Sequence, residues 1–429
     1  MRLVPLSGSQ PRAACGEAPG GKAVVVKDKC KPLVLLVGPT PPPWFGQAVG
    51  MQILLDAVHL NQSYTLVHLN INNVDKPLVC KVLATVSFLL RYLWKLLVHN
   101  PDALYLLVSR SRMGCIKDCI VMGLARLRRV PVVVHLHGGD LAVFYRGLGP
   151  LWQRLLRSFY CHVTVAIVLG ESLRSQFDGL LPAERVCVVH NCWLDDDRTY
   201  SFNRQERPDS QPLNVLFLSN VLPSKGLFDA LEGVAYAVSR GVKLQFQFAG
   251  RFLDVDGALS KLPGFAHQNL RACELEKTYE RLIADLEIHK HVSRLGGVFG
   301  RYKWALLAKT DIVLLPIYNP TEGQPLVVIE AMRAGCAIIS TQCGGLVDIV
   351  EDGITGKVVP PRSPVAIGEA IKWFWEHPGE LGRIGENNMR RAAALHSPEE
   401  HVRRIREIFG EVLSGSDRRV HVSPASTVP

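Results

Sequence analysis

The chain has 429 residues, of which 48% are hydrophobic and 21% are charged. This composition excludes a disordered or collagen-like chain, and the length favours two domains over one. The formal net charge of +10 favours an anionic partner, which is a phosphorylated small molecule, a nucleic acid or an anionic membrane surface. The eleven cysteines show neither CxxC pairs nor metal-ligand spacing, so we expect small buried side chains in a reducing compartment.

The first part of the chain alternates between short apolar runs and helical patterns. Residues 1–30 are rich in Gly, Pro, Ala and Lys and predict a flexible leader. Strands are then expected at 31–39, 65–71, 102–109, 130–139, 162–170 and 185–191, with helices at 46–58, 78–99 and 114–127. Strands that alternate with helices predict a doubly wound parallel sheet.

A polar stretch at 195–212 interrupts this alternation and is interpreted as an interdomain linker. Strands are expected again at 213–219, 243–250, 292–298, 311–317, 336–341, 344–353 and 355–361, and helices at 226–240, 302–309, 325–334, 367–375 and 399–413. The prediction is an α/β chain of two Rossmann-like domains, 31–207 and 208–395, facing each other across a cleft. A helix at 396–414 is expected to pack back on the first domain, before a flexible tail at 415–429.

The most apolar segment, Leu78–Val98, is tested as a membrane span. Lys81, Arg91 and Lys95 interrupt it, and a spanning helix tolerates central charges poorly. We therefore predict an amphipathic helix that packs on a sheet. A membrane-surface role is the second interpretation.

Two glutamates, Glu322 and Glu330, flank the start of the helix expected at 325–334. Pro325 suits the first helical position, because its missing N–H costs nothing there. Glu322, Gly323 and Gln324 then lie beside free N–H groups, where an anionic ligand binds readily. The spacing predicts a clamp on two parts of one ligand, although a capping Glu322 and a solvated Glu330 would explain it equally well.

The context of these glutamates resembles a known family. "EGQPLVVIEAMRAGCAIIST", the following Gly-Gly and "DGITGKVVPP" are similar to the E-x7-E region of the retaining glycosyltransferases of family 4, which have the GT-B fold. The resemblance is strong over 213–361 and weaker from residue 31. It implies that Glu330 binds the ribose hydroxyls of a nucleotide sugar and that Glu322 contacts the transferred sugar. It also implies that Gly323, Gln324, Pro325 and Leu326 contact the donor.

"FLSNVLPSKG" carries a cation suited to a diphosphate, Lys225, at the end of an expected strand. A lone Lys-Gly is more often an ordinary surface feature. The resemblance implies that Lys225 neutralises the leaving diphosphate together with an arginine, but Asn220 occupies the arginine position here. Arg251 is our candidate for the missing cation.

Two further segments of the first domain predict site residues. In "GPTPPPWFGQAVG" the resemblance matches Gly46 to a glycine loop beside the donor phosphate. In "HLHGGD", His137 is expected at a carboxyl end of a strand and, by resemblance, near the transferred sugar. A histidine satisfied by the backbone is the simpler interpretation. A metal site with His135 and Asp140 is a third, and the resemblance implies none.

The segment "GRYKWALLAK" at 300–309 resembles the part of the family that borders the nucleotide base. We expect Trp304 to be a packing residue, and Tyr302 could have either role. "LDDDR" at 194–198 contains a D-x-D pattern but falls at the start of the linker, and we interpret it as a solvated loop.

The resemblance implies an enzyme that moves a hexose, with retained anomeric configuration and without metal or cofactor, from a nucleoside diphosphate sugar to a glycan or lipid-linked hydroxyl. Polysaccharide or glycolipid biosynthesis would be its setting, in the cytoplasm. Residues 31–205 hold 18 Lys and Arg against 11 Asp and Glu, which favours contact with the inner face of an anionic membrane. A non-catalytic nucleotide-sugar-binding relative and a sugar-nucleotide epimerase are the alternatives. No nucleic-acid-binding signature is present.

Overall fold

The computed structural model describes residues 31–42, 45–71, 78–194, 211–255 and 270–415. The predicted leader, the linker up to residue 210 and the tail from residue 416 lie outside these ranges, and so does the D-x-D pattern. Contacts divide the chain into Met1–Lys31 and Pro32–Pro429, and the second of these units is described below.

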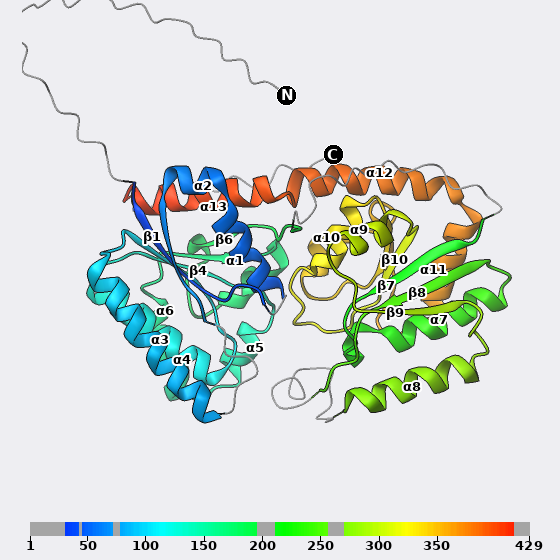
Figure 1. Cartoon of the computed structure of the whole chain (residues 1–429), viewed down its shortest axis with the longest axis horizontal. Helices are drawn as coiled ribbons and strands as arrows, with labels where there is room; N and C mark the ends of the chain where they lie inside the picture. The colour runs from blue at the N-terminus through cyan, green and yellow to red at the C-terminus, as the bar shows by residue number, and fades with distance from the viewer. Residues whose placement is uncertain (1–30, 43–44, 72–77, 195–210, 256–269, 416–429) are drawn as a thin grey trace, which may run out of the picture. The chain divides into compact units, whose positions relative to one another are not determined.

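The first sheet has six parallel strands in the order β2-β1-β3-β4-β5-β6 (Figure 1). Its strands are β1 (Leu33–Val37), β2 (Thr65–Leu69), β3 (Ala103–Leu107), β4 (Val132–His135), β5 (Val165–Val168) and β6 (Val186–Val188). Side chains alternate between its faces, so Leu35 and Val37 enter one core and Val34 and Leu36 the other. We call this sheet with its helices the first lobe.

Helices cover both faces of the first sheet, as a buried parallel sheet requires. One face packs on α1 (Gly46–Asp56) and α2 (Val58–Ser63). The other packs on α3 (Leu78–Val98), α4 (Arg112–Leu127), α5 (Leu141–Arg146) and α6 (Pro150–Tyr160). The predicted packing of 78–99 on the sheet is confirmed, whereas α5 and α6 were not predicted.

The second sheet has the strand order β12-β11-β10-β7-β8-β9. We call this sheet together with its helices the second lobe. Its strands are β7 (Leu213–Leu218), β8 (Leu244–Ala249), β9 (Val292–Gly296), β10 (Ile312–Leu315), β11 (Ala337–Ser340) and β12 (Gly356–Val358). Its helices are α7 (Leu227–Ser239), α8 (Ala272–Asp285), α9 (Gly300–Ala308), α10 (Leu326–Arg333), α11 (Pro364–Glu376) and α12 (Pro378–Leu395). The strand order is that of dinucleotide-binding folds, and it reverses between β7 and β10, where such sheets bind ligands. Two doubly wound parallel sheets are thus confirmed.

Helix α12 was not predicted, and two further details of the second lobe differ from the prediction. The strand expected at 344–353 is a 3-10 helix, Gly344–Asp348, because Gly344 takes a φ of +54° and Leu346 N–H bonds to Cys343 C=O instead of a neighbouring strand. Helix α10 starts one residue later than predicted. Pro325 is its N-cap, with an extended ψ of 124°.

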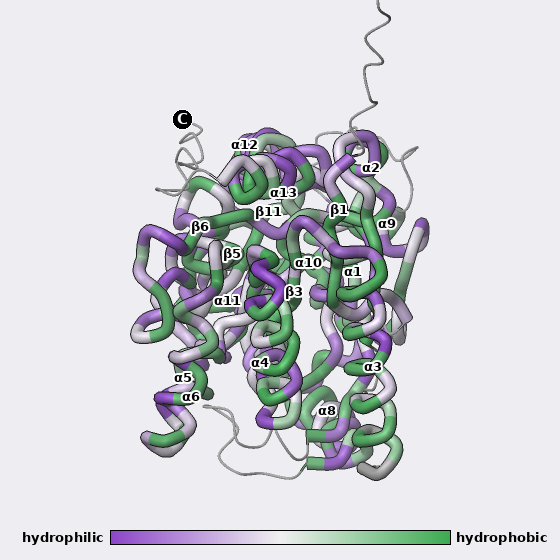
Figure 2. Tube along the Cα trace, turned by 90° about the vertical axis from the view of Figure 1, so that its left-hand side faces the viewer, coloured by the Kyte–Doolittle hydropathy of each residue, from purple (hydrophilic) through white to green (hydrophobic). Residues whose placement is uncertain are grey.

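The last helix, α13 (Pro398–Leu413), follows α12 and returns to the first lobe (Figure 1). Its residues Val402, Ile405, Ile408 and Phe409 belong to the same core cluster as strands β1 and β3. Tyr64 Oη donates a hydrogen bond to the Arg406 carbonyl at 3.2 Å, which fixes α13 next to β2. The tube in Figure 2 shows α12 and α13 together at one end of the molecule.

Candidate active site

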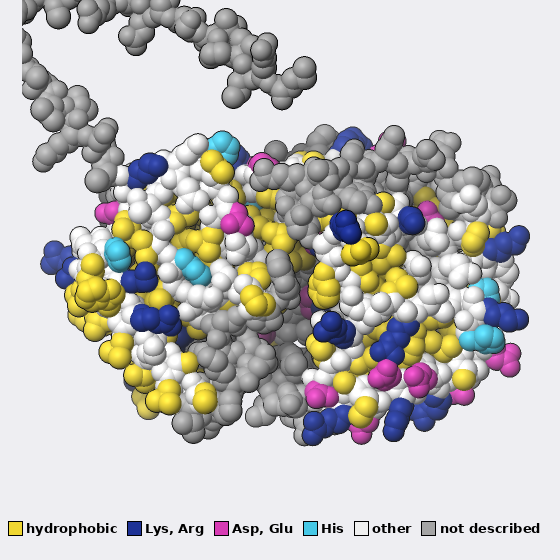
Figure 3. Space-filling view, viewed as in Figure 1, with side chains coloured by type: hydrophobic (Ala, Val, Ile, Leu, Met, Phe, Trp, Pro, Cys, Tyr) yellow, Lys and Arg dark blue, Asp and Glu magenta, His cyan; other side chains and the backbone are white. Residues whose placement is uncertain are grey.

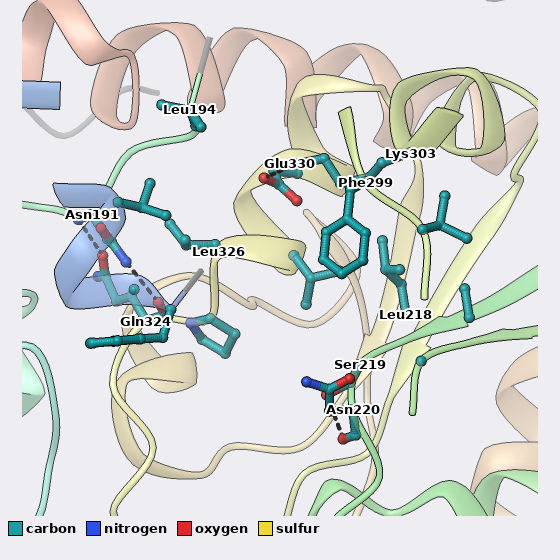
Figure 4. Close-up of a pocket in the computed structure, with 18 of the residues that line it drawn as sticks. Asn191, Leu194, Leu218, Ser219, Asn220, Phe299, Lys303, Gln324, Leu326 and Glu330 are labelled. Carbon is teal, nitrogen blue, oxygen red and sulfur yellow. Dashed lines mark hydrogen bonds and ion pairs between the residues drawn. The ribbon is translucent and has the colours of Figure 1, made fainter. Parts of the chain in front are cut away.

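A cavity of about 620 Å³ lies at the carboxyl ends of both sheets. The first lobe contributes the start of α1, His137 after β4, and Asn191 and Leu194 after β6. The second lobe contributes the ends of β7 and β8, the start of α9, and the loop from β10 into α10. Figure 4 shows Asn191 and Gln324 on one side of this cavity and Phe299, Lys303 and Asn220 on the other. The cavity therefore occupies the position where doubly wound sheets bind ligands.

Glu322 and Lys225 form an ion pair that faces the cavity. Lys225 Nζ lies 2.8 Å from Glu322 Oε1, and each side chain is 17% exposed. Lys225 ends the short turn after β7, and Glu322 belongs to the loop after β10. Glu322 does not cap α10 with its side chain. The pair thus presents a charged amine and a carboxylate to a ligand, with little competing water.

Glu330 and Lys303 form a second ion pair in the same cavity. Lys303 Nζ lies 2.6 Å from Glu330 Oε1, and the side chains are 15% and 7% exposed. Glu330 is the fifth residue of α10, so it is a buried cavity residue and not the solvated residue of the simpler interpretation. Lys303 also lies 4.8 Å from the centre of the buried Trp304 ring, and Trp304 is a packing residue as predicted.

Helix N-termini supply further positive charge to the cavity. Gly46 begins α1, Gly300 begins α9, and Leu326 and Val327 begin α10, and all four residues line the cavity. Backbone N–H groups in the first turn of a helix have no partner within the helix and attract anions. The predicted anion site at α10 is thus joined by two other helix starts.

Asn220 lines the cavity but Arg251 does not. The Asn220 side-chain oxygen accepts a hydrogen bond of 3.1 Å from the Arg251 backbone N–H, so Asn220 holds the loop after β7 against the loop after β8. The Arg251 side chain is exposed, and its Nε lies 3.1 Å from where a Cβ on Gly297 would be. The structure therefore places this cation at the cavity's edge, behind Gly297.

Gln324 joins the two lobes through its side chain and its backbone. Its Oε1 accepts from the Asn191 backbone N–H at 2.9 Å, and its carbonyl accepts from Asn191 Nδ2 at 3.0 Å. Its Nε2 lies 3.1 Å from His190 Nδ1. His396, at the end of α12, contacts the Asn191 carbonyl at 2.9 Å. The Gln324 amide is thus committed to the first lobe, so it positions the loop that carries Glu322.

His137 lines the cavity on the first lobe. Its ring centre lies 4.1 Å from that of His135, and a Cβ on Gly50 would lie only 2.8 Å from its Cε1. Burial lowers the pKa of His137 to about 3, with a further contribution from the nearby His401 and Arg110. The imidazole is therefore neutral near pH 7 and suits hydrogen bonding better than proton abstraction.

The alternative metal site does not assemble around His137. His135 Nδ1 lies 2.6 Å from Tyr105 Oη, and Asp140 pairs with Arg110 at 2.9 Å. Within the described residues, no three His, Cys, Asp or Glu side chains are grouped as metal ligands.

Comparison with known proteins relates this geometry to a family. Residues 37–192 match the glycosyl transferase 4-like domain, and residues 200–391 match the glycosyl transferases group 1. The chain belongs to the group 1 glycosyltransferases. This glycosyltransferase is 23% identical over 304 residues to the alpha-D-kanosaminyltransferase of Streptomyces kanamyceticus, which covers 67% of the chain and 72% of that protein.

Other relatives match shorter parts of this glycosyltransferase. The D-rhamnosyltransferase WbpZ of Pseudomonas aeruginosa is 34% identical over 99 residues, or 23% of this chain and 26% of its own. The putative colanic acid biosynthesis glycosyltransferase WcaL of Salmonella typhimurium is 22% identical over 58% of both chains. This chain therefore spans less than two thirds of either relative.

Solved structures confirm the GT-B fold of this glycosyltransferase. HepE of Anabaena, in complex with UDP and glucose, superposes with a TM-score of 0.63 over 88% of this chain and 99% of its own, at 16% identity. Sucrose-phosphate synthase of Thermosynechococcus elongatus gives 0.63 over 90% and 100%, also at 16% identity. Such distant likeness shows the fold alone.

Several cavity residues of the glycosyltransferase were not predicted from sequence, among them Lys303, Phe299 and Asn191. Lys303 follows β9 at the start of α9, and a basic residue in the first turn after a parallel strand is the signal that could have found it. Phe299 is 60% exposed and directs its ring into the cavity (Figure 4), whereas the neighbouring Tyr302 is outside the cavity lining. Asn191 ends the predicted strand "RVCVVHN", and no pattern in the sequence indicates its hydrogen bonds to Gln324.

Proposed function

We propose that this glycosyltransferase moves a hexose from a nucleoside diphosphate sugar to a hydroxyl group with retained anomeric configuration. The observation that carries the proposal is the convergence of two Lys–Glu pairs and three helix N-termini on one cavity. The cations and N–H groups match a diphosphate, and the two carboxylates match the hydroxyls of two sugar rings. The epimerase alternative has no observation in its favour.

The proposed donor pose follows from the positions of the charged groups. The diphosphate lies at the start of α10 beside Lys225, and the ribose hydroxyls bind the Glu330 carboxylate. The transferred sugar lies by Glu322 and His137, whose neutral imidazole donates or accepts a hydrogen bond. The nucleobase lies against Phe299. UDP is the first nucleotide to test, because the HepE structure contains UDP.

The proposed chemistry needs stabilisation of charge and no covalent intermediate on the protein. The bond from the anomeric carbon to the diphosphate oxygen breaks, and the acceptor oxygen attacks the same face of the sugar. The leaving phosphate takes the acceptor's proton. Lys225 and the N–H groups of α10 stabilise the leaving diphosphate, which is the role we propose in place of a metal ion.

The acceptor proposed is a glycan or lipid-linked hydroxyl that reaches the cavity from the first lobe. The non-catalytic alternative rests on Asn220, which leaves one cation fewer at the diphosphate than the family usually has. Lys303 stands in the same cavity and supplies a second amine, so we favour an active enzyme.

The test is a thermal-shift screen with UDP-, GDP-, ADP- and TDP-sugars, followed by turnover of the stabilising donor. Glu330→Ala is expected to weaken donor binding about thirtyfold or more, because hydrogen bonds to a charged group contribute about 1.5–3 kcal/mol each. Lys225→Ala is expected to retain binding within about tenfold and to lower kcat by about 100-fold or more. The control, Arg240→Gln, changes an exposed arginine that does not line the cavity. Donor binding and turnover like the unmodified enzyme in both cavity variants would refute the assignment, as would an inverted product by NMR.

A further inference from the structure

Three neighbouring helices of the first lobe carry most of the exposed hydrophobic side chains. Helices α3, α4 and α6 cover the same face of the sheet, with α4 between the other two. Of the 23 large hydrophobic side chains exposed in the described residues, eight lie on α3, four on α4 and three on α6. They include Leu83, Leu90, Trp94, Leu127, Leu151 and Trp152. We call the outward surface of these helices the α3–α4–α6 face (Figure 2).

Helix α3 is apolar on two opposite sides. Phe88, Tyr92 and Leu96 are buried in the core of the first lobe. Leu90 and Trp94 point the other way and are 63% and 64% exposed. Large exposed apolar side chains that gather on one side of a helix mark an interaction surface, so the outer side of α3 needs a covering surface.

The charge of the chain is concentrated around the same helices. Residues 78–160 contain twelve Lys and Arg, three Asp and no Glu, a net +9 of the chain's +10. Of the three aspartates, Asp118 is buried beside Lys117 and Asp140 pairs with Arg110. Figure 3 shows basic and hydrophobic side chains intermingled over this part of the first lobe.

The exposed arginines of the α3–α4–α6 face are not neutralised by the described part of the chain. Arg91, Arg154 and Arg157 are exposed, and none of them pairs with a carboxylate of the described residues. In the second lobe some exposed arginines do pair, as Arg294 does with Glu276 and Arg383 with Glu380, whereas Arg240 and Arg251 pair with no carboxylate of the described residues. The α3–α4–α6 face therefore fits an anionic, apolar surface.

We propose that the α3–α4–α6 face docks on the surface of an anionic lipid bilayer. Outward Leu and Trp side chains would enter the headgroup region while the arginines contact lipid phosphates. No helix in the described ranges is long and apolar enough to cross a membrane, so the contact lies in the interface. A second copy of the chain fits less well, because two such faces would oppose like charges. The link to a lipid-linked acceptor rests on the proposed function, whereas docking itself does not.

The test is co-sedimentation of the full chain with vesicles of phosphatidylcholine alone or with 30% phosphatidylglycerol, at about 50 and 500 mM salt. Binding is expected to the anionic vesicles only and to weaken at high salt. Brominated lipids quench the fluorescence of tryptophan rings that enter the bilayer. Less quenching in the Trp94→Phe and Trp152→Phe variants than in the unmodified chain is expected if these two rings enter it.

Two sets of variants locate the surface. Arg91→Gln, Arg154→Gln and Arg157→Gln together are expected to weaken binding about 100-fold, at about fivefold for each basic residue. Leu83→Ser with Leu90→Ser is expected to weaken it tenfold or more, without loss of folding because both side chains already face water. The matched controls are exposed residues of the second lobe, Lys243→Gln with Lys290→Gln for charge and Val365→Ser for hydrophobicity.

The outcomes are distinguishable from failure of the proposed function. Donor-induced thermal stabilisation, measured on the same samples without vesicles, tests the cavity alone. Absence of binding to anionic vesicles, or equal binding by face and control variants, overturns the docking proposal. It is overturned equally if the hydrophobic variant dissociates a dimer of the chain, or if the face binds nucleic acid or an acidic protein in preference to vesicles.

Discussion

Acid is expected to destabilise the contact between the lobes through His396. This side chain is 2% exposed at the end of α12, contacts the Asn191 carbonyl and lies 5.3 Å, ring centre to ring centre, from His190. Burial lowers its pKa from 6.5 to about 3, and the positive charge of His190 and Arg391 adds to the shift. The stability contributed by the neutral ring is therefore complete above pH 6.5 and is lost as pH falls from 6.5 toward 3.

The magnitude follows from the linkage between protonation and folding. At pH 5.0 the unfolded chain carries this proton and the folded chain does not. This pH lies about 1.5 units below the unfolded pKa. At about 1.4 kcal/mol for each unit, the loss is about 2 kcal/mol. The result does not depend on the folded pKa, provided that this pKa lies well below 5.

The assay compares the unmodified chain with His396→Gln, whose amide can still donate to the Asn191 carbonyl but cannot titrate. Urea unfolding at pH 7.5 and pH 5.0, followed by tryptophan fluorescence, gives the free energy of unfolding. The unmodified chain is expected to lose about 2 kcal/mol more than His396→Gln, because the other histidines titrate in both. His289→Gln, at an exposed position, is the control and should behave like the unmodified chain. An equal loss in His396→Gln and the unmodified chain would mean that protonation of His396 is not what destabilises the fold in acid.

Three further predictions concern the cavity. Gly50→Ala should displace the His137 ring, because the new Cβ would lie 2.8 Å from His137 Cε1. We expect kcat to fall at least tenfold while the stability of the fold is nearly unchanged. The control, Gly382→Ala, has open space around its Cβ and should leave kcat unchanged. Lys303→Met should destabilise the fold by about 2–3 kcal/mol in urea unfolding, because it removes one partner of a mostly buried pair. The double variant with Glu330→Gln is expected to recover part of this loss. An unchanged free energy of unfolding in Lys303→Met would contradict the pairing. Gln324→Ala should raise the KM for the donor about tenfold with a smaller effect on kcat, and a loss confined to kcat would mean that Gln324 acts on the reaction instead of on loop position.

The sequence was sufficient for the two sheets because their strands are continuous apolar runs between Gly, Pro and polar turns. It was insufficient for α12, whose segment "PGELGRIGENNMRRAAAL" has three glycines and buries mainly Leu381, Ile384 and Ala392. The 3-10 helix at Gly344 was predicted as a strand because "GLVDIV" is rich in β-branched residues, whereas the local bonds of its backbone decide the conformation.

The candidate site shows the same division between local and distant information. The spacing of Glu322 and Glu330 and their place at a helix start are local features, and the sequence predicted a ligand clamp from them. Their lysine partners come from segments 97 and 27 positions away, so no local pattern indicates the pairs. The bonds of Gln324 to Asn191 cross between lobes and depend on how the two sheets pack, which residue spacing does not encode.

A crystal structure of the chain with bound UDP would locate the donor site itself. We expect the diphosphate within hydrogen-bond distance of Lys225 Nζ and the first N–H groups of α10, with the ribose hydroxyls on Glu330. A nucleotide bound outside this cavity, or inside it with Glu330 and Lys225 both out of contact, would contradict the account.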